Sequence, residues 1–149
     1  MNMNQTAVTD AIVEEITIHA PAERIFDALT SPQALMKWWG KEGQFGVTEC
    51  ELDLRQGGKW VMRGDSYGGR RFQVTGEYVT VERPRLLEFT WTPDWSEGAA
   101  GSVVRWDLNE RDGETTVRLT HSGLTETARQ NHRGWTQIVA WLRDYAEKA

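Results

Sequence analysis

The strongest constraint in this 149-residue chain is a long region in which apolar side chains recur at every second position. Between residues 47 and 121, apolar and polar positions alternate, and clusters containing Gly, Asp or Pro interrupt the alternation. Period-two alternation is typical of strands that bury one face, and such clusters are typical of turns. A change of phase at residues 76–79 predicts a bulge or strong bend. We therefore predict about six consecutive antiparallel strands.

Helical patterns lie on both sides of this region. Residues 12–19 alternate as one more strand, and residues 22–29 carry an apolar stripe at helical spacing. Ser31 and Pro32 are typical of the start of a second short helix. Residues 125–149 predict one long helix. Its apolar stripe comprises Trp135, Ile138, Val139, Leu142, Tyr145 and Ala146.

Strands grouped between helices indicate an α+β fold with a single antiparallel sheet of about six to seven strands. The long helix must cover the inner face of that sheet, because an apolar sheet face is buried against another element. The length is typical of one domain. We expect residues 1–10 to be a flexible tail and residues 11–149 to form the domain.

Aromatic residues set this chain apart, since it contains eight Trp. Each Trp brings a large apolar area and one N–H donor, so the core or cavity should be wide and aromatic. The inward strand positions carry Trp60, Phe72, Tyr78, Phe89, Trp91 and Trp106. Trp135 and Ile138 face them from the helix stripe. A plain core explains each ring singly, but flat rings seldom fill a curved sheet completely, so we predict a ligand cavity.

Two polar residues fall on the same inward faces. His121 continues the phase of Val117 and Leu119, and Asn131 lies in the backward extension of the helix stripe. Either side chain could contact a ligand. Alternatively, His121 is a core or loop-anchoring residue, and Asn131 bonds the loop over the helix start. Buried polar groups need hydrogen-bond partners in both cases.

Charge and composition exclude several classes of function. The net charge is −5, which disfavours nucleic acid and anionic membranes as partners. No run approaches the ~20 apolar residues of a membrane helix, and residues 1–10 lack the order of a secretory signal. We therefore expect no membrane insertion and a cytoplasmic location. One Cys and three distant His predict no metal site, and we expect no cofactor.

Several short motifs occur in a characteristic order. They are Ala20-Pro21, Thr30-Ser31-Pro32, Trp38-Trp39, Gly57-Gly58-Lys59-Trp60, Gly76-Glu77-Tyr78, Val81-Glu82-Arg83-Pro84, Leu87-Glu88-Phe89-Thr90-Trp91, Leu119-Thr120-His121-Ser122-Gly123-Leu124 and Gly134-Trp135. Over residues 12–147 the chain thereby resembles the family similar to the C-terminal domain of the activator of heat-shock-protein-90 ATPase, within the START-like (SRPBCC) superfamily. The resemblance implies the helix-grip fold, a curved sheet around a long C-terminal helix with a cavity between them. Trp38 and Trp39 follow the short helices, where this fold opens, and are expected to form the entrance or to cap the core.

Three functions are open from the sequence. The first is binding of a small apolar, aromatic or lipid-like molecule in the cavity. The second is a polyketide cyclase- or hydratase-like enzyme, as some START-like proteins are, in which His121, Asn131 or Tyr78 would move protons. The third, implied by the family name, is a co-chaperone-like interaction module in a stress response. We favour binding because no catalytic spacing is found. Trp141 lies beside the helix stripe, at a half-exposed rim or in a homodimer contact.

Overall fold

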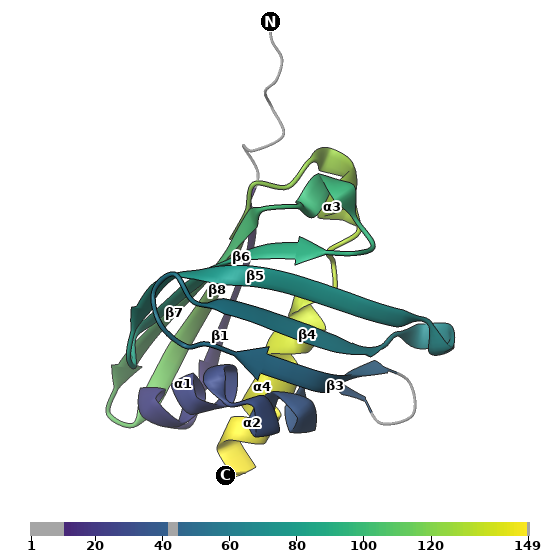
Figure 1. The fold of residues 1–149 in the computed structure, drawn as a ribbon. Helices are drawn as coiled ribbons and strands as arrows, with labels where there is room; N and C mark the ends of the chain where they lie inside the picture. Colours follow the sequence, from purple (N-terminus) through teal and green to yellow (C-terminus); the bar gives the residue numbers. More distant parts are fainter. Residues whose placement is uncertain (1–10, 42–44, 149) are drawn as a thin grey trace, which may run out of the picture.

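The structure, a computed structural model, describes residues 11–41 and 45–148 and contains eight strands and four α-helices in those ranges (Figure 1). The strands are β1 (Ile12–Ile18), β2 (Gly40–Lys41), β3 (Phe45–Leu52), β4 (Lys59–Asp65), β5 (Arg71–Glu82), β6 (Leu86–Pro93), β7 (Ser102–Arg111) and β8 (Glu114–Ser122). The helices are α1 (Ala22–Thr30), α2 (Pro32–Trp38), α3 (Glu126–Gln130) and α4 (Trp135–Lys148). The predicted tail, residues 1–10, lies outside the described residues.

All strands belong to one antiparallel sheet with the order β1-β8-β7-β6-β5-β4-β3-β2. Each strand from β3 to β8 therefore pairs with the strand before it, and β1 returns to pair with β8. Helix α4 runs along one face of the sheet, and α1 and α2 lie at one end of it (Figure 1). This arrangement confirms the predicted α+β helix-grip fold. The short β2 is the one strand beyond the six to seven expected. In the described ranges, no helix is both long and apolar enough to cross a membrane.

The predicted inward faces of the strands are confirmed by their burial. In β7, Val104, Trp106 and Leu108 are buried, whereas the alternate side chains are partly exposed. The opposite strand β8 buries Leu119 and His121, which pair with Trp106 and Val104. Side chains from neighbouring strands therefore form continuous inward rows that α4 covers.

One local prediction in the sheet is also confirmed. The register between β5 and β6 shifts between Tyr78 and Thr80, which is the irregularity expected near residues 76–79. On the outer face, Glu88 pairs with Arg105, and their charged atoms lie 3.9 Å apart. The bulge matters for the site because such irregularities bend a sheet.

The prediction of one continuous helix from residue 125 is wrong. Helix α3 ends at Gln130, and the Asn131 N–H bonds the carbonyls of Thr127 and Ala128 at its C-terminus. Helix α4 then begins at Trp135. Asn131 is consequently outside the apolar stripe, and its side chain is exposed. At the break, the His132 ring bonds the Ala128 carbonyl at 2.7 Å and accepts the Trp91 N–H at 3.2 Å, so a contact with a distant strand fixes the loop between the two helices.

Candidate ligand-binding site

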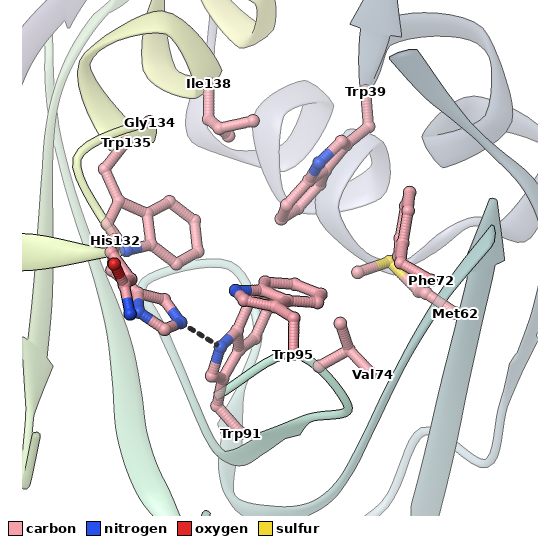
Figure 2. A pocket seen from close by; sticks show the side chains of 11 residues that line it. Trp39, Met62, Phe72, Val74, Trp91, Trp95, His132, Gly134, Trp135 and Ile138 are labelled. Atoms are coloured by element: carbon pink, nitrogen blue, oxygen red, sulfur yellow. Dashed lines mark hydrogen bonds between the residues drawn. The ribbon is translucent and has the colours of Figure 1, made fainter. Parts of the chain in front are cut away.

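A cavity of about 240 Å³ lies between the inner face of the sheet and the start of α4 (Figure 2). Strands β4, β5 and β6 supply its floor, α4 and the preceding loop supply one wall, and the end of α2 supplies another. The lining residues are Trp39, Met62, Phe72, Val74, Trp91, Trp95, Asn131, His132, Gly134, Trp135 and Ile138. Among these side chains only that of His132 can carry a full charge, and only when it is protonated.

The mouth of the cavity lies between two loops. Trp95, in the loop after β6, is 45% exposed, and Asn131 and Gly134 are exposed in the loop before α4. The Trp95 ring stacks on the His132 ring, with 5.9 Å between their centroids. It also meets the Phe72 ring edge-on at 5.8 Å. Trp95 therefore forms one side of the mouth. Part of its ring is in contact with solvent, and the rings of His132 and Phe72 hold it in place.

The inner wall is built from indole rings that contact each other. Trp91 lies 6.3 Å from Trp39 in a stacked arrangement and 5.2 Å from Trp135. Trp39 meets Trp135 edge-on at 5.9 Å. Aromatic pairs at these distances contribute about 0.5–1.5 kcal/mol each beyond their burial. The wall is therefore held in place by its own residues.

Behind this wall, His121 links two of the strands to α4. The Trp135 Nε1–H donates to His121 Nδ1 at 3.0 Å. The Ser102 hydroxyl donates to the Trp91 carbonyl at 3.2 Å, so its oxygen is left to accept from His121 Nε2 at 2.8 Å. The network is complete when His121 is neutral and carries its proton on Nε2.

His132 makes a second such link at the edge of the cavity. The Trp91 Nε1–H donates to His132 Nε2 at 3.2 Å (Figure 2), and His132 Nδ1 donates to the Ala128 carbonyl at 2.7 Å. The two histidine rings lie 5.3 Å apart. His132 is therefore also satisfied as a neutral ring, with its proton on Nδ1.

Burial keeps both histidines uncharged. Burial, with a smaller contribution from the neighbouring His132, lowers the pKa of His121 to about 3. Burial also lowers the pKa of His132, although the bond to the Ala128 carbonyl opposes this effect. At neutral pH the cavity consequently has no charged lining group. Within the described ranges, no cluster of three His, Cys, Asp or Glu is placed to hold a metal ion.

The structure divides the predicted cavity residues into two groups. Five of them line the cavity, namely Phe72, Trp91, Asn131, Trp135 and Ile138. Four others surround a separate void of about 20 Å³ farther along the sheet, namely Trp60, Tyr78, Phe89 and Trp106. His121 lies behind the cavity wall, bonded to Trp135.

The two predicted entrance residues have different positions. Trp39 lines both the cavity and the small void. Trp38 is buried in the core, and its Nε1–H donates to the Ala28 carbonyl at 2.8 Å. This bond joins α2 to α1, so Trp38 packs as a cap of the core beside the cavity wall.

Sequence reasoning missed several lining residues. Met62 and Val74 occupy the inward phase of their strands, so the alternation could have identified them. Trp95 and His132 lie in loops, where no periodicity indicates the direction of a side chain. Their aromatic character was the only available signal.

Fold and cavity together define a START-like helix-grip protein of the SRPBCC superfamily. The chain belongs to the family described as Activator of Hsp90 ATPase homolog 1-like protein, whose model matches residues 19–147. No curated protein sequence matches the chain at a significant level.

Solved structures with the same fold come from several bacteria. Protein CV1439 from Chromobacterium violaceum has a TM-score of 0.78 and 22% identity, and the alignment covers 92% of this chain and 96% of that chain. The AHSA1-like protein from Aeromonas hydrophila has a TM-score of 0.77 and 24% identity, with 93% of each chain covered. The Aha1 dimer from Colwellia psychrerythraea has a TM-score of 0.69 and 20% identity, with 93% of this chain and 97% of that chain covered. At these identities the likeness establishes the fold.

Proposed function

We propose that this protein binds a small apolar or aromatic molecule in the cavity between the sheet and α4. The observation that carries the proposal is a formed, uncharged cavity of about 240 Å³ with an aromatic wall and an open mouth. An apolar cavity of ~150 Å³ can accept benzene, so this one has room for a ring with substituents. Burial of such a molecule in an apolar site is favourable at roughly 25 cal/mol per Å².

The arrangement supports binding more than proton-transfer catalysis. A general base needs a free lone pair within reach of the substrate. Both ring nitrogens of His121 and of His132 are engaged in hydrogen bonds, and His121 lies behind the wall. Tyr78 lies beside the small void, and burial raises the pKa of its hydroxyl well above the usual value. Of the three residues suggested for a cyclase or hydratase, only Asn131 lines the cavity, and its side-chain amide does not act as a general base.

Titration with toluene, followed by Trp fluorescence and calorimetry, tests the proposal. We expect saturable one-to-one binding, because four indoles line the cavity. Val74→Phe should narrow the cavity and weaken this binding. Val79→Phe is the matched control, since Val79 is 41% exposed on the same strand and does not line the cavity. Absence of saturable binding by the unmodified protein would contradict the proposal.

Assembly with other chains remains a separate prediction. The Colwellia psychrerythraea relative is a dimer, and a homodimer of this chain is tested by sedimentation velocity. Co-purification with a chaperone would favour the interaction-module alternative. Mass spectrometry of small molecules extracted from natively purified protein would identify the cellular ligand directly.

A further inference from the structure

We infer that the cavity selects neutral, ring-sized molecules with a hydrogen-bond acceptor, and that the indole N–H of Trp39 recognises this acceptor. The inference rests on the proposed function, since it specifies the ligand of the same cavity. It follows from one unpartnered donor, from the absence of charge among the lining residues and from the cavity volume.

Trp39 is the enclosed indole of the wall whose N–H has no hydrogen-bond partner among the described residues. The N–H groups of Trp91 and Trp135 are bonded to the two histidines. Trp39 is only 8% exposed, and its nitrogen lies on the side of the ring toward Ile138 (Figure 2). Unlike the Trp60 nitrogen, the Trp39 nitrogen is not among the fully buried atoms without a partner, so water or a ligand can reach it. A ligand that displaces water from this N–H must bring an acceptor, because the donor would otherwise be left unpaired.

Neighbouring rings restrict the orientation of Trp39. Its ring lies 5.4 Å from that of Trp38 and stacks on Trp91. Trp60 also has an unpartnered N–H, but it is fully enclosed beside the void of about 20 Å³, which has room for one water at most. Trp95 is 45% exposed at the mouth, so its N–H can keep a water partner when the cavity is occupied, whereas Trp39, 8% exposed, lies deeper. Trp39 is therefore the donor best placed for a ligand.

Charge excludes ions as the preferred ligands. A carboxylate would lose its hydration without meeting a positive side chain, because the lining residues carry none and both histidines are held neutral. Aromatic walls can attract ammonium groups through ring faces. The Trp39 N–H, however, presents the positive edge of its ring, which favours an acceptor over a cation.

Size excludes long flexible ligands. The volume of about 240 Å³ exceeds that of a benzene-binding cavity by less than a factor of two. A single ring with a short substituent fits this space, whereas an acyl chain of lipid length does not. A carbonyl, ether or phenolic oxygen on that ring supplies the acceptor.

The test compares acetophenone with isopropylbenzene, in which a methyl group replaces the carbonyl oxygen. Calorimetry should show that Trp39→Phe weakens acetophenone binding about five- to tenfold, the value of one hydrogen bond. Isopropylbenzene binding should weaken less than acetophenone binding, since it loses only the apolar contact of the larger ring and no hydrogen bond. Trp95→Phe is the matched control and should affect both probes equally.

A second measurement uses the unmodified protein and does not depend on how the variant folds. Acetophenone, but not isopropylbenzene, should shift the ¹H resonance of the Trp39 indole N–H downfield in NMR spectra. Equal effects of Trp39→Phe on both probes, together with no such shift, would overturn the inference and leave the proposed function intact. Tighter binding of benzoate or phenyltrimethylammonium than of acetophenone would also overturn it. Failure of isopropylbenzene to bind at all would instead remove the proposed function.

Discussion

The two ends of the layer between the sheet and the helices have similar aromatic residues but different packing. At one end, Trp60, Phe89 and Trp106 surround a void of about 20 Å³. At the other end, Trp91 and Trp135 border a cavity of about 240 Å³. Aromatic content alone therefore does not decide whether such a layer is filled.

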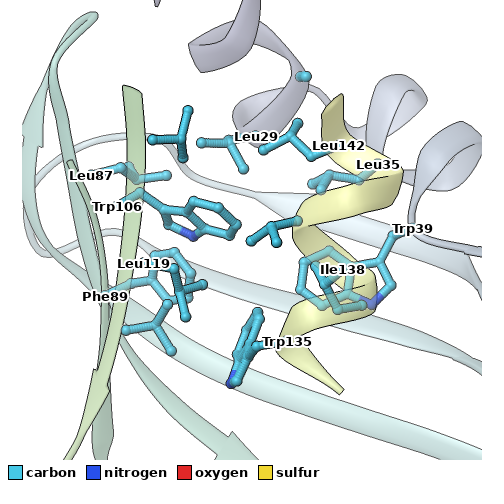
Figure 3. Packing of buried hydrophobic residues seen from close by; sticks show 14 of the residues in the cluster. Leu29, Leu35, Trp39, Leu87, Phe89, Trp106, Leu119, Trp135, Ile138 and Leu142 are labelled. Atoms are coloured by element: carbon cyan, nitrogen blue, oxygen red, sulfur yellow. The ribbon is translucent and has the colours of Figure 1, made fainter. Parts of the chain in front are cut away.

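The difference comes from the helices. Leu29 of α1 and Leu35 of α2 reach the filled end, whereas Trp135 lies at the opposite end of the same cluster (Figure 3). The end with the larger cavity is bordered by the loop before α4. In this loop Gly134 has no side chain and Asn131 is exposed, so neither residue fills the cavity. Trp39 and Met62 line both spaces and stand between them. Aliphatic side chains of α1 and α2 thus fill one end of the layer and do not reach the other.

The largest effect on stability is expected in the filled end. Trp106→Ala should lower the free energy of unfolding by about 3–5 kcal/mol, because Trp106 is completely enclosed and leaves a large cavity. Phe72→Ala should lower the free energy of unfolding by less, because Phe72 already borders a cavity. Urea denaturation of both variants measures the difference. Equal losses of unfolding free energy in the two variants would show that the two ends are packed alike.

Met62→Ala should remove the boundary between the two spaces. We expect a loss of about 2–4 kcal/mol in unfolding free energy, together with binding of two-ring probes such as naphthalene more tightly than by the unmodified protein. Met36→Ala is the control, because Met36 is 42% exposed. Unchanged probe selectivity would mean that the two spaces stay separate.

Acid should destabilise the open end through its histidines. Because the folded-state pKa of His121 is lowered to about 3, the unfolded chain binds more protons between pH 6.5 and pH 3. Stability contributed by neutral His121 is present above pH 6.5 and is lost toward pH 3, at up to ~1.4 kcal/mol per pH unit. His121→Gln should reduce this slope. Chemical denaturation at several pH values provides the measurement, and identical slopes would contradict the assignment.

Trp95→Ala should have the smallest effect on stability. Trp95 is 45% exposed, so we expect a loss of about 1 kcal/mol or less. Toluene affinity should fall several-fold, because the ring forms one face of the mouth. Stability and calorimetric binding are measured on the same sample, and a stability loss as large as that of Trp106→Ala would make Trp95 part of the core.

Much of the fold could be predicted because its signals are local. The alternation in β7 and β8 placed Trp106 and Leu119 on the inward face, and the change of phase near Gly76 anticipated the bulge. The cavity was harder to predict. All ten proposed residues were assigned to one space, whereas Trp60 and Phe89 lie around the other. Alternation gives the direction of a side chain but not how closely its neighbours approach.

The sequence by itself determined which faces of the strands are apolar, where the short helices begin and that the layer would be aromatic, because these properties depend on residues close together in the chain. Only the tertiary structure decided that α4 begins at Trp135, that the space opens at one end and that both histidines are neutral. These features depend on contacts between distant segments, such as the bond from Trp91 to His132, 41 residues away. Contacts between residues so far apart in the chain leave no periodic pattern in the sequence. Burial, which sets the protonation of His121, exists only after the chain has folded.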